Sequence, residues 1–136
     1  MRYLSEEWAK EALAVVETDE RVAEATHGIQ VSVLAIVLHP PEGAYGFIHV
    51  AFDGNGLSDY RVGHDYQAVT EGIADPTFVV SGEYDVFARI QAGEFSERKA
   101  ILTGRLHLTG SFLKALRYMS ALETIGEALR SVPCET

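Results

Sequence analysis

The sequence has 136 residues, 47% of them hydrophobic, and it carries 11 Lys and Arg against 20 Asp and Glu. This length is typical of one domain with a full hydrophobic core, so we expect a single domain over residues 1–136. The formal charge of −9 excludes a general nucleic-acid binder, because such proteins need a basic surface to displace counterions from phosphates. The hydrophobic content excludes a disordered chain.

Cysteine content and hydropathy indicate a reducing compartment. Cys134 is the only cysteine, so one chain can form neither a disulfide nor a thiolate zinc site. No apolar run approaches the roughly 18 uncharged residues that a membrane-spanning helix needs. The N-terminus turns acidic at Glu6 and Glu7, where a signal peptide would become apolar. We therefore expect a cytoplasmic protein.

The first half of the chain predicts two helices followed by three strands. Ser5 is a suitable N-cap for a helix to Glu17, and Gly28 can end a second helix that begins at Asp19. Residues 29–38 are β-branched and apolar on both faces, which favours a central strand. A second strand is predicted over 45–52, a turn over 53–56, and a more polar, edge-like strand over 57–63.

The second half predicts an alternation of strands and helices after an irregular stretch from Asp65 to Gly72. The elements expected are a strand over 77–81, a helix capped by Ser81 or Gly82 and ending before Gly93, a helix over 96–103, a strand over 105–109, a helical region opened by Ser111, and a further turn or short helix around Ile125. Hairpins followed by helix-connected strands predict an α+β fold with helices gathered on one face of a sheet.

Catalytic and metal-binding patterns are weak. The five histidines lie in or beside different elements and form no His-x-x-x-His pair, so we expect no metal site and no cofactor. The Asp53–Asp59 segment lacks the ligand spacing and the turn glycine of a calcium loop. The glycines at 104 and 110 bracket a strand and form no phosphate-binding loop.

Large apolar side chains are abundant between Tyr84 and Met119. One interpretation is an ordinary core. The other is a cavity between helices and sheet for an apolar ligand, since ligand pockets are concave, mostly apolar and carry few polar groups. Residue spacing alone leaves both interpretations open.

Several segments match the pattern of a known protein family in their order and spacing. In residues 75–93 an Asp-x-Thr strand ends in a Ser and passes into a helix stopped by Gly. Residues 104–110 follow as a Gly, alternating strand, Gly stretch, and the helix after Leu4, the strand after Gly28 and the Asp53-Gly54 turn precede both. This order resembles the sterol carrier protein 2 (SCP2) family, and the resemblance covers nearly the whole chain.

The resemblance implies an α+β fold with a mixed, mostly antiparallel sheet of about five strands, helices on one face and an apolar tunnel between the layers. It also implies a non-enzymatic carrier of fatty acids, fatty acyl-CoA, sterols or other lipids. We expect the tunnel to be lined by Phe87, Ile90, Ile101, Leu102, Phe112, Leu116 and Met119.

Charge is unevenly distributed along the chain. Residues 98–122 carry five basic side chains and no acidic one, whereas residues 1–97 carry 5 basic and 17 acidic side chains. Because the basic run coincides with elements expected to border the tunnel, we predict that it meets an anionic head group. The residues assigned to this role are Arg105, Lys114 and Arg117.

Two alternatives to a free lipid carrier remain. One is a small cone-shaped α+β enzyme of the isomerase or dehydratase type, with Asp59, Tyr60 or His64 as acid and base in an apolar pocket. The other is an accessory subunit that delivers a lipid to a partner enzyme. The expected partners are thus an apolar small molecule, a partner enzyme and a transiently contacted membrane, with no nucleic acid, and the chain is expected to be a monomer or a homodimer.

Overall fold

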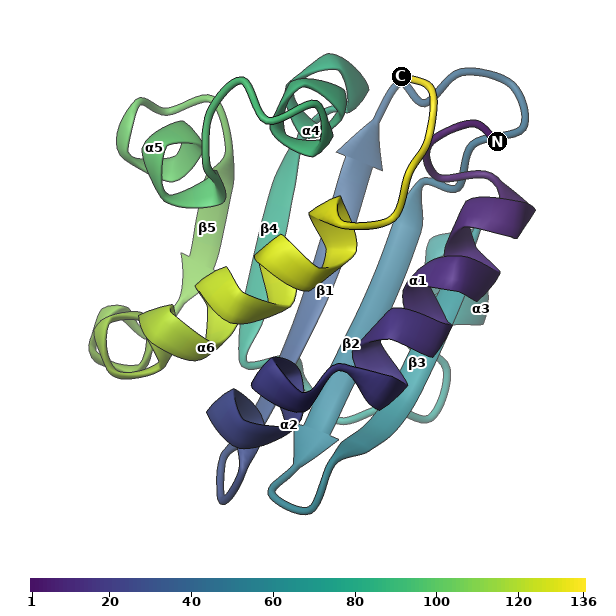
Figure 1. Cartoon of the computed structure of the whole chain (residues 1–136). Helices are drawn as coiled ribbons and strands as arrows, with labels where there is room; N and C mark the ends of the chain where they lie inside the picture. The colour runs from purple at the N-terminus through teal and green to yellow at the C-terminus, as the bar shows by residue number, and fades with distance from the viewer.

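The computed structural model describes all 136 residues as a five-stranded sheet with six helices (Figure 1). The helices are α1 (Glu6–Thr18), α2 (Glu20–Thr26), α3 (Tyr66–Thr70), α4 (Tyr84–Gln91), α5 (Glu97–Leu102) and α6 (Phe112–Arg130). The strands are β1 (Gln30–Leu38), β2 (Phe47–Asp53), β3 (Leu57–Gly63), β4 (Phe78–Glu83) and β5 (His107–Gly110). No helix is both long enough and apolar enough to cross a membrane.

Strand β1 lies at the centre of the sheet, whose order is β3-β2-β1-β4-β5. It pairs antiparallel with β2 and parallel with β4, while β2–β3 and β4–β5 are antiparallel. The central position of β1, with a neighbouring strand on each side, fits the apolar, β-branched sequence of residues 30–38. The expected mixed, mostly antiparallel sheet is confirmed, and the polar strand β3 does lie at an edge.

Helix ends follow the capping residues in the sequence. The Ser5 hydroxyl accepts a hydrogen bond from the Trp8 amide at 3.2 Å, and the Ser111 hydroxyl does the same for the Lys114 amide at 3.3 Å. Asp19 caps α2 by accepting from the Arg21 amide at 2.8 Å. Each cap satisfies a backbone donor that the first turn of a helix leaves without a partner.

Five helices pack on one face of the sheet, and the short helix α3 lies on the other. Ile48 and Val50 face the five helices, so their neighbours Phe47 and His49 face the opposite side, where the Phe47 ring lies 5.8 Å from the Tyr66 ring of α3. The expectation of an irregular stretch after Asp65 is therefore wrong. The Asp65 carboxylate caps α3 by accepting from the Ala68 amide at 3.1 Å, but a five-residue helix is too short to show a helical period.

The C-terminal region forms one continuous helix, α6, where a helix and a separate short turn were expected. Gly126 lies inside it and is tolerated because the residue is buried against α5, where a side chain would not fit. Helix α4 begins after Glu83 instead of Ser81 or Gly82, because β4 continues its pairing with β1 as far as Glu83. Figure 1 shows α6 crossing the sheet obliquely from the β5 edge.

Candidate functional site

An apolar cavity of about 190 Å³ lies between the sheet and the helices. Of the 25 residues that line it, 19 are hydrophobic. The sheet contributes Val31, Val33, Ala35, Ile48, Val50, Phe52, Phe78, Val80 and Leu108, the helices contribute Trp8, Phe87, Ile90, Ile101, Met119, Leu122, Ile125 and Leu129, and Tyr3 and Leu106 lie just before α1 and β5. Such a wall favours binding of an apolar ligand, because binding removes the apolar surface of both the ligand and the wall from water.

The cavity lies over the middle of the sheet, where a packed core would be expected. Val33 and Ala35 occupy the central strand β1, yet both are only half-buried. Ala35 pairs with Ile48 on β2 and with Val80 on β4, and both of these neighbours also line the cavity. A small side chain at the centre of the floor therefore leaves space that the helices above do not fill.

The contact between α5 and α6 forms a polar rim of the cavity. The guanidinium of Arg130 donates to both carboxylate oxygens of Glu97, at 2.6 and 2.7 Å. Gly126 makes room for this pair, since a Cβ at that position would lie 2.5 Å from the Glu97 Oε1 atom. Both charged side chains are about a quarter to a third exposed, and charge-assisted hydrogen bonds of this length are among the stronger polar contacts in proteins.

Two further polar contacts extend this rim. Arg98 of α5 lies 3.8 Å from the Glu123 carboxylate of α6, and both of these side chains line the cavity. The Gln91 side-chain amide of α4 donates to the backbone oxygens of Leu129 and Val132, at 3.4 and 3.1 Å. The cavity is thus apolar within and is bordered by side-chain contacts that join α4, α5 and α6.

Four of the seven side chains assigned to the tunnel from sequence line the cavity: Phe87, Ile90, Ile101 and Met119. The other three, Leu102, Phe112 and Leu116, are not among the lining residues, and they are 76%, 74% and 60% exposed. Spacing put all of them on apolar helix faces, but at the end of α5 and in the first turns of α6 these side chains are exposed.

The three residues assigned to a head group lie outside the cavity lining. The Arg105 guanidinium lies 4.7 Å from the Phe95 ring centre, the Arg117 guanidinium lies 5.7 Å from the Tyr118 ring centre, and Lys114 is exposed in the first turn of α6. The arginines at the cavity rim are instead Arg98 and Arg130. Sequence reasoning missed the ion pairs of these two arginines, because their partners come from a different helix.

Trp8 of α1 also lines the cavity, although no signal in the sequence indicated this role. It is 2% exposed, and its indole Nε1 has no hydrogen-bond partner. The Tyr3 ring packs edge-on against it at 5.0 Å. Burial raises the pKa of Tyr3 above its ordinary value, so its hydroxyl stays neutral at the cavity wall. Because Trp8 is the only tryptophan of the chain, its fluorescence reports on this cavity alone.

The residues of the alternative acid–base site do not converge. The Tyr60 hydroxyl donates to the backbone oxygen of Ala9 at 2.9 Å, whereas the Asp59 carboxylate lies 2.6 Å from His49 Nδ1 on the opposite face of the sheet. The His64 ring stacks against Tyr45 at 4.8 Å. No group of three or more His, Cys, Asp or Glu side chains is arranged to hold a metal ion.

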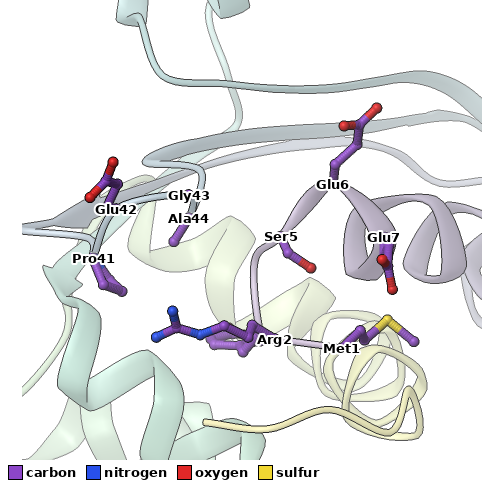
Figure 2. Close-up of a pocket in the computed structure, with 10 residues that line it drawn as sticks. Met1, Arg2, Ser5, Glu6, Glu7, Pro41, Glu42, Gly43 and Ala44 are labelled. Carbon is purple, nitrogen blue, oxygen red and sulfur yellow. The ribbon is translucent and has the colours of Figure 1, made fainter.

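A second hollow, of about 400 Å³, lies between the N-terminal segment and the loop over residues 41–44 (Figure 2). Only three of its ten lining residues are hydrophobic, and Figure 2 shows the carboxylates of Glu6 and Glu42 pointing away from the space between them. Such an open, polar depression has neither the apolar wall nor the convergent polar groups of a ligand site.

An apolar cavity between a mixed sheet and a helical layer is the arrangement typical of domains that bind small apolar ligands. Within that class, the chain belongs to the SCP-2 sterol transfer family, whose sequence pattern matches residues 9–123. The resemblance noted in the sequence is thereby confirmed. Membership supports lipid binding and transfer as the general activity, and domains of this family are typically non-enzymatic.

Solved structures share this fold at low sequence identity. A conserved protein from Thermus thermophilus, described as a candidate sterol carrier protein, is 18% identical with a TM-score of 0.75, over 99% of this chain and 92% of that one. A crystal structure of sterol carrier protein 2 is also 18% identical with a TM-score of 0.75, over 97% and 100%. A ubiquinone synthesis protein named UbiJ-SCP2 is 13% identical with a TM-score of 0.52, over 87% and 86%. No curated protein matches the chain in sequence.

Proposed function

We propose that this protein binds the apolar body of a lipid in the cavity between the sheet and the helices, and carries or presents it without chemical change. The observation that carries the proposal is the 190 Å³ cavity with its apolar wall over the centre of the sheet. Burial of apolar ligand surface is favourable by about 25 cal/mol per Å². A fatty acid, a fatty acyl-CoA or a sterol-like molecule supplies that surface.

The size of the cavity requires that it widen around such a ligand. Pockets for molecules of this size usually measure roughly 300 to 1,000 Å³, and a dry cavity of roughly 150 Å³ holds a molecule as small as benzene. The rim between α5 and α6 is the place where widening costs least, since it is held by the Glu97–Arg130 pair and the exposed Arg98–Glu123 pair instead of a packed core. We infer that ligand enters where these two helices part.

The head-group assignment is retained as part of this proposal. The three residues Arg105, Lys114 and Arg117 lie outside the cavity. They can therefore contact only an anionic group on a part of the bound ligand that extends beyond the cavity rim. A fatty acyl-CoA, with phosphates beyond its acyl chain, fits that placement better than a fatty acid whose carboxylate is buried. Charge-assisted hydrogen bonds from arginine to phosphate are the contacts expected there.

The experiment is mass spectrometry of the intact protein as purified, followed by titration of the lipid-free protein with a fatty acid, a fatty acyl-CoA and a sterol. We expect a co-purified lipid or saturable binding of one class, together with a change in Trp8 fluorescence. A folded, lipid-free protein that takes up no member of the panel would refute the proposal.

Delivery of the lipid to a partner enzyme is a second candidate. The observation that favours it is the similarity to UbiJ-SCP2, a domain whose name places it in ubiquinone synthesis. Purification of the protein from its own cells under mild conditions tests this candidate. Recovery of one enzyme in fixed proportion, whose activity on a lipid substrate rises when this protein is added, would support it. Recovery of the free protein alone, with no such effect, would refute it.

A further inference from the structure

Exposed apolar side chains are concentrated in one segment of the chain, from the end of α5 to the first turns of α6. Seven large hydrophobic residues are exposed, and four of them, Leu102, Phe112, Leu113 and Leu116, lie within 15 residues of the sequence. These four are 60% to 76% exposed, more than all the others, whose maximum is 50%. Single exposed hydrophobic residues are ordinary in soluble proteins, but a cluster of this kind marks an interaction surface.

The cluster continues the cavity rim along α6. Phe112, Leu116 and Met119 follow one another at steps of four and three residues, so they form one stripe on the helix. The same steps lead on to Glu123, Gly126 and Arg130, which contact α5. The N-terminal half of this stripe is apolar and uncovered, and its C-terminal half closes the rim. A surface that covers the uncovered half therefore lies next to the ligand cavity.

The segment that carries this cluster has charges of one sign. Lys114 and Arg117 lie on the face of α6 next to Leu113, since successive residues turn by about 100°. Lys99 of α5 and Arg105 before β5 belong to elements at the same edge of the sheet, since β5 is an edge strand and Figure 1 shows α5 at one end of it and the start of α6 at the other. No acidic residue occurs between positions 98 and 122.

We propose that this surface, formed by Leu102, Phe112, Leu113 and Leu116 with the flanking basic residues, docks on an anionic lipid bilayer. Apolar side chains with adjacent lysines and arginines are the pattern of a helix that lies in a membrane interface. A second copy of the chain is disfavoured as occupant because it would place two basic surfaces against each other. The docking does not require that the cavity binds lipid, so the two proposals fail separately.

Binding to vesicles tests this proposal with lipid-free protein. We expect co-sedimentation with vesicles of phosphatidylcholine and phosphatidylglycerol, weak co-sedimentation with phosphatidylcholine alone, and loss of binding at high salt. The triple variant Phe112→Ser, Leu113→Ser, Leu116→Ser and the double variant Lys114→Glu, Arg117→Glu should each weaken anionic-vesicle binding by at least about tenfold. Because all five side chains are exposed, both variants should keep the far-ultraviolet spectrum and unfolding midpoint of the wild type.

Matched controls test whether the loss of vesicle binding is specific to this surface. Leu38→Ser removes another exposed hydrophobic side chain, and Lys10→Glu reverses an exposed charge on α1, so neither should change vesicle binding. Equal binding to both kinds of vesicle, no binding to either, or equal loss in the controls would overturn the proposal. A wild-type dimer that the triple serine variant converts to a monomer would also overturn it, because the cluster would then be an interface between copies.

Discussion

Replacing Ala35 by leucine decides whether the space above β1 is a cavity or a packed core. Ala35 lies at the centre of the cavity floor, between Ile48 and Val80 in the sheet. The substitution adds three carbon atoms at a position where the helices leave room. Ala12→Leu is the matched control, because Ala12 is fully buried in α1 within the packed cluster that contains Tyr3 and does not line the cavity.

The two substitutions should change stability in opposite directions. Each added carbon that is removed from water contributes about 0.8 kcal/mol, so Ala35→Leu gains at most about 2.4 kcal/mol. The same three carbons forced into a packed site cost about 1 to 3 kcal/mol. We therefore expect Ala35→Leu to leave the free energy of unfolding unchanged or raise it, and Ala12→Leu to lower it, with a difference of about 1 kcal/mol or more between the variants.

Urea unfolding of the lipid-free proteins, followed by circular dichroism, measures this difference. In parallel, lipid titration should show affinity reduced at least about tenfold in Ala35→Leu, because the added side chain occupies ligand space. Equal destabilisation by both substitutions would show that the space above Ala35 does not exist in solution. A stable Ala35→Leu variant with unchanged lipid affinity would show that the ligand binds elsewhere.

Three further predictions concern the rim, the buried phenol and the basic run. Gly126→Ala places a Cβ against the Glu97 carboxylate and breaks the ion pair of Glu97 with Arg130. A bound lipid should therefore dissociate faster, as measured by stopped-flow Trp8 fluorescence. An unchanged dissociation rate would mean that the lipid does not leave between α5 and α6. Burial raises the pKa of Tyr60 to about 12 from an ordinary value of 10.0. Folding therefore favours the neutral phenol, whose stabilising effect is complete below pH 10 and is lost as the pH rises through 12. Tyr60→Phe should accordingly flatten the alkaline fall in the free energy of unfolding, and an identical fall in both proteins would contradict the assignment. Charge reversal at Lys114 and Arg117 should weaken binding of fatty acyl-CoA more than binding of an uncharged sterol, and equal effects on both ligands would exclude a head-group role.

The elements that the sequence predicted well are those with a local physical signal. Ser5 and Ser111 cap helices because a hydroxyl satisfies an amide three residues ahead, which depends on no distant contact. The apolar run from Ile29 to Leu38 implied a central strand, and β1 is the central strand of the sheet. Helix α3 was missed because a single turn with one buried residue, Val69, carries too little pattern.

The candidate site was predictable only in part, for a physical reason. Helical spacing identifies which side chains share a face, and this was enough to find Phe87, Ile90 and Met119 at the cavity. Spacing does not tell how far a neighbouring element extends over that face. Phe112 and Leu116 continue the face of Met119 beyond the reach of α5, so they are exposed although their pattern is that of core residues.

The stripe of α6 that runs from Phe112 to Arg130 has two different halves, because α5 contacts it only at Glu123, Gly126 and Arg130. From Glu123 to Arg130 the stripe is held to α5 by two ion pairs, of which Arg98–Glu123 is long, largely exposed to water and therefore weak. From Phe112 to Leu116 it is apolar and uncovered. In the carrier that we propose, the apolar half of α6 inserts into a bilayer, and the same helix closes the cavity. Insertion can therefore shift α6 away from α5, because ion pairs separate at lower cost than a packed core. Vesicle docking and lipid release should therefore be coupled, so that anionic vesicles accelerate lipid release from the wild type and not from the triple serine variant.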